Sequence, residues 1–475
     1  MSLVLRRFLE SSVLFIHVIR WFLIATAVGV IVGLSSTAFL LALDWSVDQA
    51  GRWNWYWLLL PAGLVVSTYL VRWFAPDAEG HGTEKVIEAL HRKSGRIRLA
   101  VVPVKALATI VTIAVGGAAG KEGPAAQIGA GLASKMADIL HFSDDERKKI
   151  VMCGISAGFA VVFGTPIAGA IFGVEVLFVG ALVYDVLFPS FVAGIVAFST
   201  AHWMGLTYPH AFQQFTVEIE PLLMVETLAA GIFFGLLALL FIESMRLARK
   251  IVQRLKWSPF FTALTGGVLL VGMAAVLGRQ YLGLGIEEAN AVVRGAEASP
   301  LAPFFKMVFT SITLNFGGSG GTLSPIFYIG ATGGRLFASI LNLDQSLFAA
   351  IGMVALLAGA TNTPISASIM AVELFGPQIV PYAALASIVA YLMSGHRSIY
   401  PSQVLAIIKS PALRIETGKQ LQDIVAPVHF QPDQADQYSS LLIKGSVTAI
   451  RKIRGSIRRS KHLPAKVEKP PGEGQ

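Results

Sequence analysis

The chain has 475 residues, of which 54% are hydrophobic and 14% are charged, with a mean hydropathy of +0.64 and a formal net charge of +9. Soluble domains contain about 25% charged residues, so this composition excludes a soluble globular protein and indicates an all-α polytopic membrane protein. The single cysteine, Cys153, excludes an intramolecular disulfide framework, and one cysteine cannot form a metal cluster. We therefore expect an integral, multi-pass membrane protein without a metal site.

Both ends of the chain are basic. Residues 1–20 include Arg6 and Arg7 and lack a small-residue cleavage site, which favours an N-terminal cytoplasmic helix over a removed signal peptide. Lysines and arginines also gather between Lys444 and Lys469. Because cytoplasmic segments carry an excess of these residues, both termini are predicted to be cytoplasmic, with an even number of full crossings.

Between the two ends the chain alternates apolar runs with short polar breaks. Several runs are shorter than the roughly 20 residues that a straight membrane span needs. Glycine, proline and threonine bound them, which predicts broken helices that line protein or a water-filled cavity. Ser143 to Glu146, SDDE, predicts a capping box at the start of a helix. The predicted runs are 21–43, 55–74, 99–119, 124–140, 150–163, 166–183, 188–205, 224–246, 260–278, 301–316, 325–341, 347–360, 364–375 and 380–394.

An internal repeat divides the apolar part. TPIAGAIFGVEV at 165–176 matches TPISASIMAVEL at 363–374, and GGAAGKEGPAAQIGA at 116–130 matches GGSGGTLSPIFYIGA at 317–331. We assign repeat one to about 21–205 and repeat two to about 224–405. Interrupted segments at corresponding positions of two halves indicate a transport site at their interface. The sequence leaves open whether the halves are parallel or inverted.

The stretch GGAAGKEGPAAQIGAG, Gly116 to Gly131, is the strongest candidate for that site. Pro124 suits the first turn of a helix, and the glycines before it allow the backbone to approach a ligand. Such a turn directs free N–H groups and the positive end of a helix dipole at one point, which is typical of an anion site. Glu122 places a carboxylate beside that point, from which it could leave when protonated. The alternative is a glycine-rich helix contact in which Glu122 pairs with Lys121.

Over roughly residues 20–405 the chain resembles the CLC chloride channel and transporter family. GKEGP at 120–124, GGTLSP at 320–325 and GHRSIYPS at 395–402 look like three of the family's motifs, and GHGTEKV at 80–86 stands at the place of a fourth. The resemblance implies two inverted-topology repeats of broken and tilted helices, and a homodimer with one pore per subunit. It implies chloride as the ligand, no other cofactor and Glu122 as the gate. The implied anion-binding residues are His81, Gly82, Lys121, Gly123, Thr322, Leu323 and Tyr400.

The resemblance also bears on the rest of the chain. Residues 406–475 are predicted to form a basic cytoplasmic tail, partly disordered and too short for the paired nucleotide-binding modules of many eukaryotic relatives. This tail is expected to meet anionic lipid rather than nucleic acid. The lack of such modules and of a signal peptide fits a prokaryotic inner membrane.

Three departures from the family pattern affect the expected mechanism. His81 stands in place of an anion-coordinating serine, and Leu323 in place of a phenylalanine. Val176 stands where proton-coupled members carry a second acid, so the proton-relay position is lost. We therefore predict a passive chloride channel gated by Glu122 and opened by external acid. The alternatives are a chloride/proton antiporter with another relay, such as Glu175 or a water wire from His81, and a fluoride-selective exporter.

A membrane enzyme, such as a lipid transferase, is the rival class. The nine histidines are scattered, and the chain contains no H-E-x-x-H, G-x-S-x-G or phosphate-loop motif. Broken glycine-rich helices are better explained by transport, so no enzymatic activity is expected.

Overall fold

The computed structural model describes residues 3–208, 213–410, 413–424 and 429–430. The chain forms two units, one of Met1–Ile407 with Thr417–Ile424, and one of Ile408–Glu416 with Val425–Gln475. In the second unit, β3 (Leu413–Arg414) pairs antiparallel with β4 (His429–Phe430). Most of the predicted basic tail, 406–475, lies outside the described residues.

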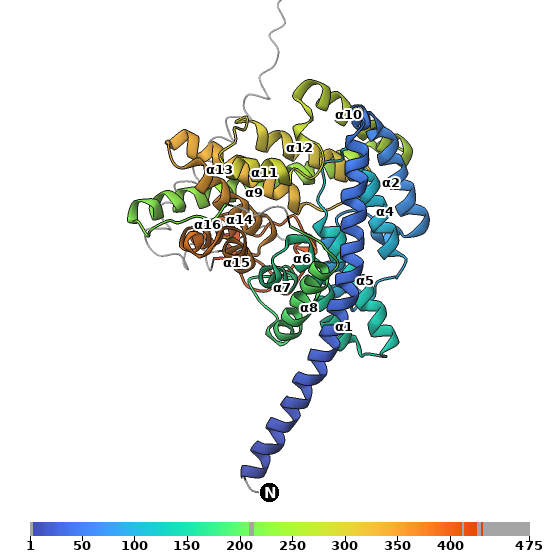
Figure 1. Ribbon diagram of the computed structural model, residues 1–475, viewed down its shortest axis with the longest axis vertical. Coiled ribbons are helices and arrows are strands. Elements are labelled where there is room, and N and C mark those ends of the chain that lie inside the picture. The colour runs from blue at the N-terminus through green and yellow to red at the C-terminus, as the bar shows by residue number, and fades with distance from the viewer. Residues whose placement is uncertain (1–2, 209–212, 411–412, 425–428, 431–475) are drawn as a thin grey trace, which may run out of the picture. The chain divides into compact units, whose positions relative to one another are not determined.

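Helices build the first unit, in agreement with the predicted all-α membrane fold (Figure 1). Its strands are β1 (Phe178–Val179) and β2 (Val404–Leu405), which pair in parallel. Its α-helices are α1 (Leu3–Gly51), α2 (Leu60–Phe74), α3 (Gly82–Arg92), α4 (Val101–Ala114), α5 (Glu122–Ile139), α6 (Asp144–Phe163), α7 (Pro166–Glu175), α8 (Tyr184–Trp203), α9 (Pro221–Leu255), α10 (Pro259–Leu277), α11 (Ile286–Val293), α12 (Ala302–Asn315), α13 (Leu323–Leu341), α14 (Gln345–Thr361), α15 (Pro364–Phe375) and α16 (Val380–Met393).

Helix α1 joins the predicted N-terminal helix at 1–20 to the apolar run that follows, so residue 20 is not a helix end. Its 49 residues correspond to a length of about 70 Å, more than twice the thickness of a bilayer core. Figure 1 shows its N-terminal part extending beyond the other helices. The described helices that are long and apolar enough to span a membrane lie within Ser11–Gly51, Tyr56–Phe74, Tyr184–Trp203, Pro221–Leu255 and Pro259–Leu277.

Arginine and lysine side chains mark one end of this unit. Arg20 of α1 and Arg96, which follows α3, pair with acids in the first turn of α6, at 2.6 and 3.0 Å. Arg92, at the end of α3, pairs with Asp423 at 2.7 Å. We call this the basic end. The opposite end, where Asp44 and Asp48 of α1 lie, is the pocket end, named for the cavity described below.

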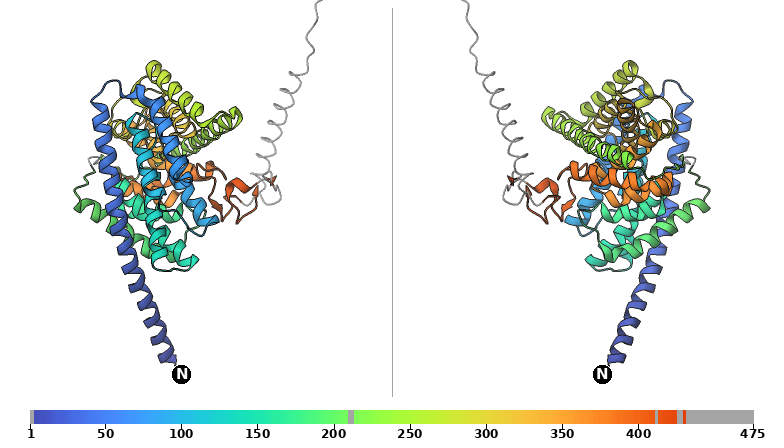
Figure 2. Two further views of the ribbon diagram at one scale, coloured as in Figure 1. Left: turned by 90° about the vertical axis from the view of Figure 1, so that its right-hand side faces the viewer. Right: turned by 90° about the vertical axis from the view of Figure 1, so that its left-hand side faces the viewer.

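Helices α1–α8 and α9–α16 form the two repeats, and the repeats are inverted. Gly120 and Gly321, just before α5 and α13, each donate a backbone N–H to the other's carbonyl at 2.7 Å. From this junction α5 runs to the basic end, where α6 begins. Helix α13 runs the opposite way (Figure 1 and Figure 2). Its Arg335 donates to the Gly295 carbonyl, which follows α11. Two equivalent helices that leave one point in opposite directions require an inverted relation.

Two of these helices, α3 and α11, do not coincide with any predicted apolar run. Helix α3 carries Glu84, Lys85 and Glu88 on eleven residues, and α11 begins with Glu287 and Glu288. Their charges conceal them from a search for hydrophobic spans, although one face of each is buried. Both lie beside the site.

A pair of carboxylates fixes the interface between the repeats. Glu175, at the end of α7, accepts from the backbone N–H groups of Ile365 and Ser366 at 3.0 and 2.8 Å. Its repeat mate Glu373, on α15, accepts from Ile167 and Ala168 of α7 at 3.0 and 2.7 Å. Each carboxylate therefore caps the N-terminus of the other helix, where its charge is stabilised by the helix dipole.

We expect Glu175→Ala to lower stability, because it leaves two N–H groups of α15 without a partner inside the protein. A lost hydrogen bond to a charged group corresponds to about 1.5–3 kcal/mol. The thermal unfolding of purified protein in detergent should show this loss, whereas Glu243→Ala, which removes a half-exposed ion pair with Arg246, should leave it nearly unchanged. Equal unfolding temperatures for the two variants would contradict the capping role.

Candidate functional site

Glu122 is the first residue of α5, and it closes the junction between the repeats. Its carboxylate accepts the backbone N–H of Ser324 at 3.1 Å and also the Ser324 hydroxyl. Glu122 is buried, and among the described residues no ion pair joins it to Lys121. The carboxylate therefore binds to the first turn of α13, across the repeat interface, and not to its neighbour in the chain.

The N-termini of α3, α5 and α13 meet around this carboxylate. A Cβ on Gly82 would lie 2.2 Å from the carbonyl oxygen of Gly123, and a Cβ on Gly321 would lie 2.8 Å from the Gly123 nitrogen. Only glycine allows backbones to approach so closely. The first turn of a helix has N–H groups without intrahelical partners, and the dipoles add positive potential, so the junction can hold an anion. The structure thus places Gly82, Gly123, Thr322 and Leu323 at this junction.

His81 and Tyr400 lie on the α3 side of the junction. The backbone of His81 bridges to Gly320, and its ring atom Nδ1 is buried without a hydrogen-bond partner among the described residues. The Tyr400 hydroxyl is buried and lies 3.3 Å from Thr322 Oγ1. Both side chains thus offer donors close to the backbone N–H groups, as expected for anion-binding residues.

Lys105 of α4 holds the loop that carries His81. Its ammonium group is buried and donates to the carbonyls of Ala78 and Gly80 at 3.2 and 2.6 Å. Lys306, its repeat equivalent on α12, donates in the same way to the loop before α11. Lys105 therefore positions the start of α3.

The remaining predicted positions have different surroundings. Val176 is buried at the end of α7, and its carbonyl accepts from the Gln403 side chain at 2.8 Å. An apolar side chain and a neutral amide thus occupy the lost proton-relay position. Leu323 is also fully buried. Lys121 precedes α5 and lines the cavity at the pocket end.

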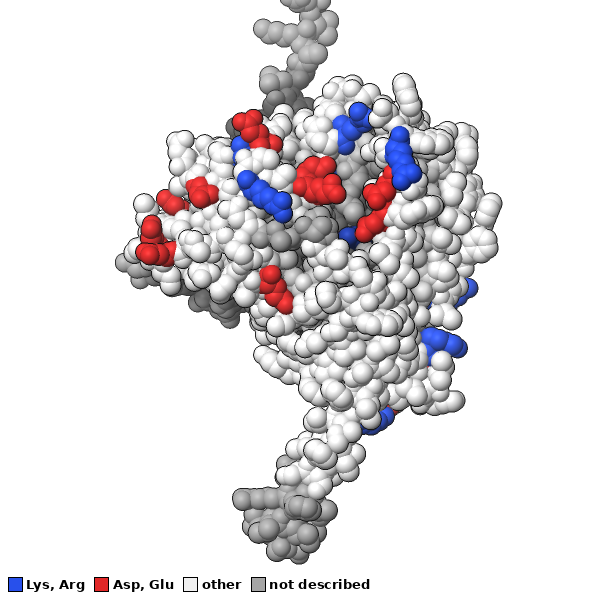
Figure 3. Space-filling view, in the orientation of Figure 1, with Lys and Arg blue, Asp and Glu red and all other residues white. Residues whose placement is uncertain are grey.

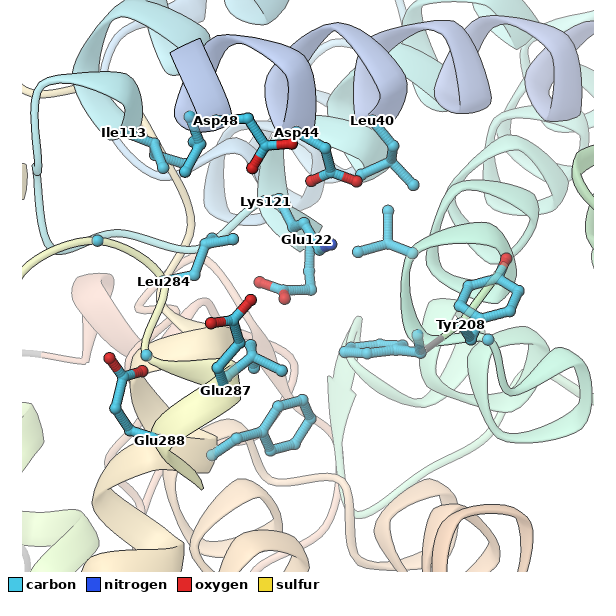
Figure 4. A pocket seen from close by; sticks show the side chains of 18 of the residues that line it. Leu40, Asp44, Asp48, Ile113, Lys121, Glu122, Tyr208, Leu284, Glu287 and Glu288 are labelled. Carbon is cyan, nitrogen blue, oxygen red and sulfur yellow. The ribbon is translucent and has the colours of Figure 1, made fainter. Parts of the chain in front are cut away.

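That cavity has a volume of about 610 Å³ and leads to Glu122. Figure 3 shows charged side chains gathered round a hollow in this face, with largely uncharged surface below it. In Figure 4, Glu122 and Glu287 point into the same space from different helices, with Lys121 and Asp44 beyond Glu122. The Glu122 carboxylate therefore lies at the wall of this cavity. The charged residues that line the cavity are Asp44, Asp48, Lys121, Glu122, Arg279, Glu287, Glu288 and Glu373.

Sequence reasoning missed two polar residues at the junction. Ser324 belongs to the GGTLSP motif but had no role assigned, although it is the residue that binds the Glu122 carboxylate. Glu84, two residues after Gly82, is a buried carboxyl that accepts from Ser402. The sequence did contain a signal for Glu84, because a glutamate so close to the predicted anion-binding glycine indicates a residue of the site.

The family model described as voltage gated chloride channel matches residues 62–395. The chain belongs to this family, the CLC proteins. A chloride/fluoride channel protein of Pseudomonas syringae pv. tomato is 39% identical over 400 residues, covering 82% of this chain and 87% of the relative. The voltage-gated ClC-type chloride channel ClcB of Salmonella typhimurium is 29% identical over 419 residues, which cover 80% of this chain and 98% of the relative.

Solved structures agree with this assignment. The crystal structure of a CLC-type fluoride/proton antiporter has a TM-score of 0.76 and 27% identity, and covers 81% of this chain and 97% of that protein. A slow cyanobacterial Cl⁻/H⁺ antiporter shares the fold, with 20% identity and a TM-score of 0.69. The match covers 80% of this chain and 96% of that protein. The chain is thus a multi-pass CLC membrane protein, and the function of its family is anion transport, not the enzymatic alternative.

Proposed function

We propose that this CLC protein is a halide transporter gated by Glu122, which exchanges fluoride or chloride for protons. The observation that carries the proposal is the Glu122 carboxylate, bound to Ser324 at the point where three helix N-termini meet. An anion can use the same donors only after this carboxylate has left them. Protonation removes its charge and weakens both hydrogen bonds, so halide passage is linked to proton binding.

The choice of fluoride besides chloride follows from the donors and from the relatives. Fluoride is a small, strongly accepting anion, and the Ser324 hydroxyl and the His81 ring add donors to the backbone N–H groups. The relative that is 39% identical is named for both halides, and the solved relative that is 27% identical is named for fluoride and protons.

The passive chloride channel predicted from the sequence is the alternative transport mode. Val176 favours it, because valine cannot carry a proton, and the relative from Pseudomonas syringae is named a channel. Glu175 caps the N-terminus of α15 through two backbone N–H groups, which gives its carboxylate a structural role. We favour exchange because the solved relative that is 27% identical is named a fluoride/proton antiporter, and because protonation of Glu122 would release it from Ser324.

Halide efflux from liposomes tests the proposed substrates. Vesicles loaded with fluoride or with chloride should each release their anion when purified protein and a potassium ionophore are present. Ion-selective electrodes record both. Release of chloride alone would contradict the fluoride assignment, and release of neither would contradict transport by this protein.

The orientation and assembly remain proposals. By the positive-inside rule we place the basic end and both termini on the cytoplasmic side of a prokaryotic inner membrane, so the cavity faces outward. The predicted homodimer would need an apolar surface, and α7, α8, α15 and α16 offer one through Ile167, Ile195, Ile365 and Ile388. Measuring the molecular mass of the purified protein in detergent would test whether it is a dimer.

Ser324→Ala should loosen the gate. It removes the hydroxyl bond to the ionised carboxylate, a loss of about 1.5–3 kcal/mol that raises the open fraction about tenfold or more. Halide efflux at neutral external pH should rise accordingly. Ser339→Ala, an exposed serine further along α13, is the matched control. An unchanged rate in Ser324→Ala would show that its hydroxyl does not hold the gate.

A further inference from the structure

Glu84 is a buried carboxyl in the first turn of α3, at the cytoplasmic side of the junction in the proposed orientation. It is 6% exposed and accepts the Ser402 hydroxyl at 2.6 Å and the Ser402 backbone N–H at 3.1 Å. No ion pair involves Glu84 among the described residues. A buried carboxyl without a cation at contact distance can exchange between its charged and neutral forms, unlike one held in an ion pair.

A line of polar side chains connects Glu84 to the surface at the basic end. Gln422 donates to Ser402 Oγ at 3.4 Å and to Gln420 Oε1 at 2.9 Å. The same Gln420 oxygen accepts from Arg92 at 2.8 Å, and Arg92 is about half-exposed. We call these residues the polar chain: Glu84, Ser402, Gln422, Gln420 and Arg92. Hydrogen bonds between polar side chains therefore extend from Glu84 to the surface, where water can deliver protons.

In the other direction, polar atoms lead from Glu84 towards the gate. The Tyr400 hydroxyl lies near Thr83, the residue before Glu84, and 3.3 Å from Thr322 of α13. Thr83 Oγ1 and His81 Nδ1 are buried and have no hydrogen-bond partner of ordinary geometry within the described part of the chain. Buried polar atoms are nearly always paired, so these two indicate room for a water or an anion between Glu84 and Glu122.

The charged groups around Glu84 come from separate elements. Arg249 of α9 and Glu88 of α3 act on it electrostatically with opposite signs. Glu84 and Glu122 both act electrostatically on the Tyr400 hydroxyl.

We propose that Glu84 is the internal proton-transfer group of this protein, replacing the acid that is lost at Val176. Water at the basic end delivers a proton to the Glu84 carboxylate. The O–H bond of the resulting acid then breaks as a new O–H bond forms on Glu122, through water held between His81, Thr83 and Tyr400. Glu84 returns to its charged form, and neutral Glu122 leaves Ser324. This inference rests on the proposed proton-coupled exchange.

The Glu84→Gln variant tests the proposal, because glutamine keeps a carbonyl oxygen for Ser402 but cannot carry a proton. In liposomes with a halide gradient, its proton movement should fall about 100-fold, within the usual contribution of a positioned proton donor. Halide efflux should continue at a rate near that of the wild type. Glu88→Gln, which alters a partly exposed acid one turn further along α3, should keep both fluxes.

Each outcome distinguishes the inference from the function on which it rests. If the wild type exchanges halide for protons and Glu84→Gln still moves protons, the proposed role of Glu84 is overturned, but the proposed exchange is not. Loss of both fluxes in Glu84→Gln, with a lowered unfolding temperature, assigns Glu84 to structural support of Ser402 and also overturns the proposal. Halide efflux without proton movement in the wild type overturns the proposed exchange and the inference together.

Discussion

Glu122→Gln is expected to remove the pH dependence of halide efflux and to abolish proton movement. Glutamine has the shape of the protonated acid, but it cannot take up or release a proton. Its neutral amide oxygen makes bonds to Ser324 that are about 1 kcal/mol or more weaker than those of the carboxylate, so resting efflux should rise several-fold. Proton movement should fall about 100-fold. Efflux recorded in liposomes at acidic and neutral external pH measures both effects.

Glu287→Gln is the matched control for this variant, because Glu287 lines the same cavity (Figure 4) and no hydrogen bond joins it to Ser324 among the described residues. It should preserve the response to external acid. The gate assignment would be wrong if Glu122→Gln kept a normal pH response and normal proton movement.

Gly82→Ala is expected to disable the anion site. The new Cβ would lie 2.2 Å from the Gly123 oxygen and 2.9 Å from the Pro124 nitrogen. Because these are backbone atoms, the clash cannot be relieved by a change of side-chain rotamer. Helix α3 must therefore move away from α5. Overpacking of this kind costs about 1–3 kcal/mol, and a displacement near 1 Å at a functional site can lower a rate about 100-fold. Efflux and thermal unfolding should be measured together.

Gly272→Ala provides the comparison, since Gly272 lies within α10 and no atom approaches the position of its Cβ within 4 Å. This variant should transport and unfold like the wild type. Normal efflux in Gly82→Ala would mean that the close approach of α3 and α5 is not needed for anion passage.

The repeated motifs made much of this architecture predictable. GKEGP and GGTLSP mark the starts of α5 and α13, because glycine and proline have definite positions at helix N-termini. The capping box predicted at Ser143 is confirmed, with Glu146 and Ser143 each accepting the other's backbone N–H. The predicted family and fold are confirmed by the family match and the solved relatives.

Other features depend on contacts between distant segments and could not be read from the chain. Helix α3 contains too many charges to stand out as a membrane helix, since its polar residues are matched by partners such as Ser402, 318 residues away. The inverted relation of the repeats appears only once α5 and α13 are seen to leave one junction. Ser324 lies two residues from Thr322, but its bond to Glu122 crosses the repeat interface.

Proton movement driven by a halide gradient is the most direct test of coupled exchange. Purified protein in liposomes is given a fluoride gradient, no initial pH gradient and a voltage clamped by valinomycin, and a pH electrode records the external medium; a chloride gradient repeats the test. Our account predicts that protons move against their gradient while the halide runs down. Halide efflux with no proton movement for either ion would contradict it and would establish the passive channel.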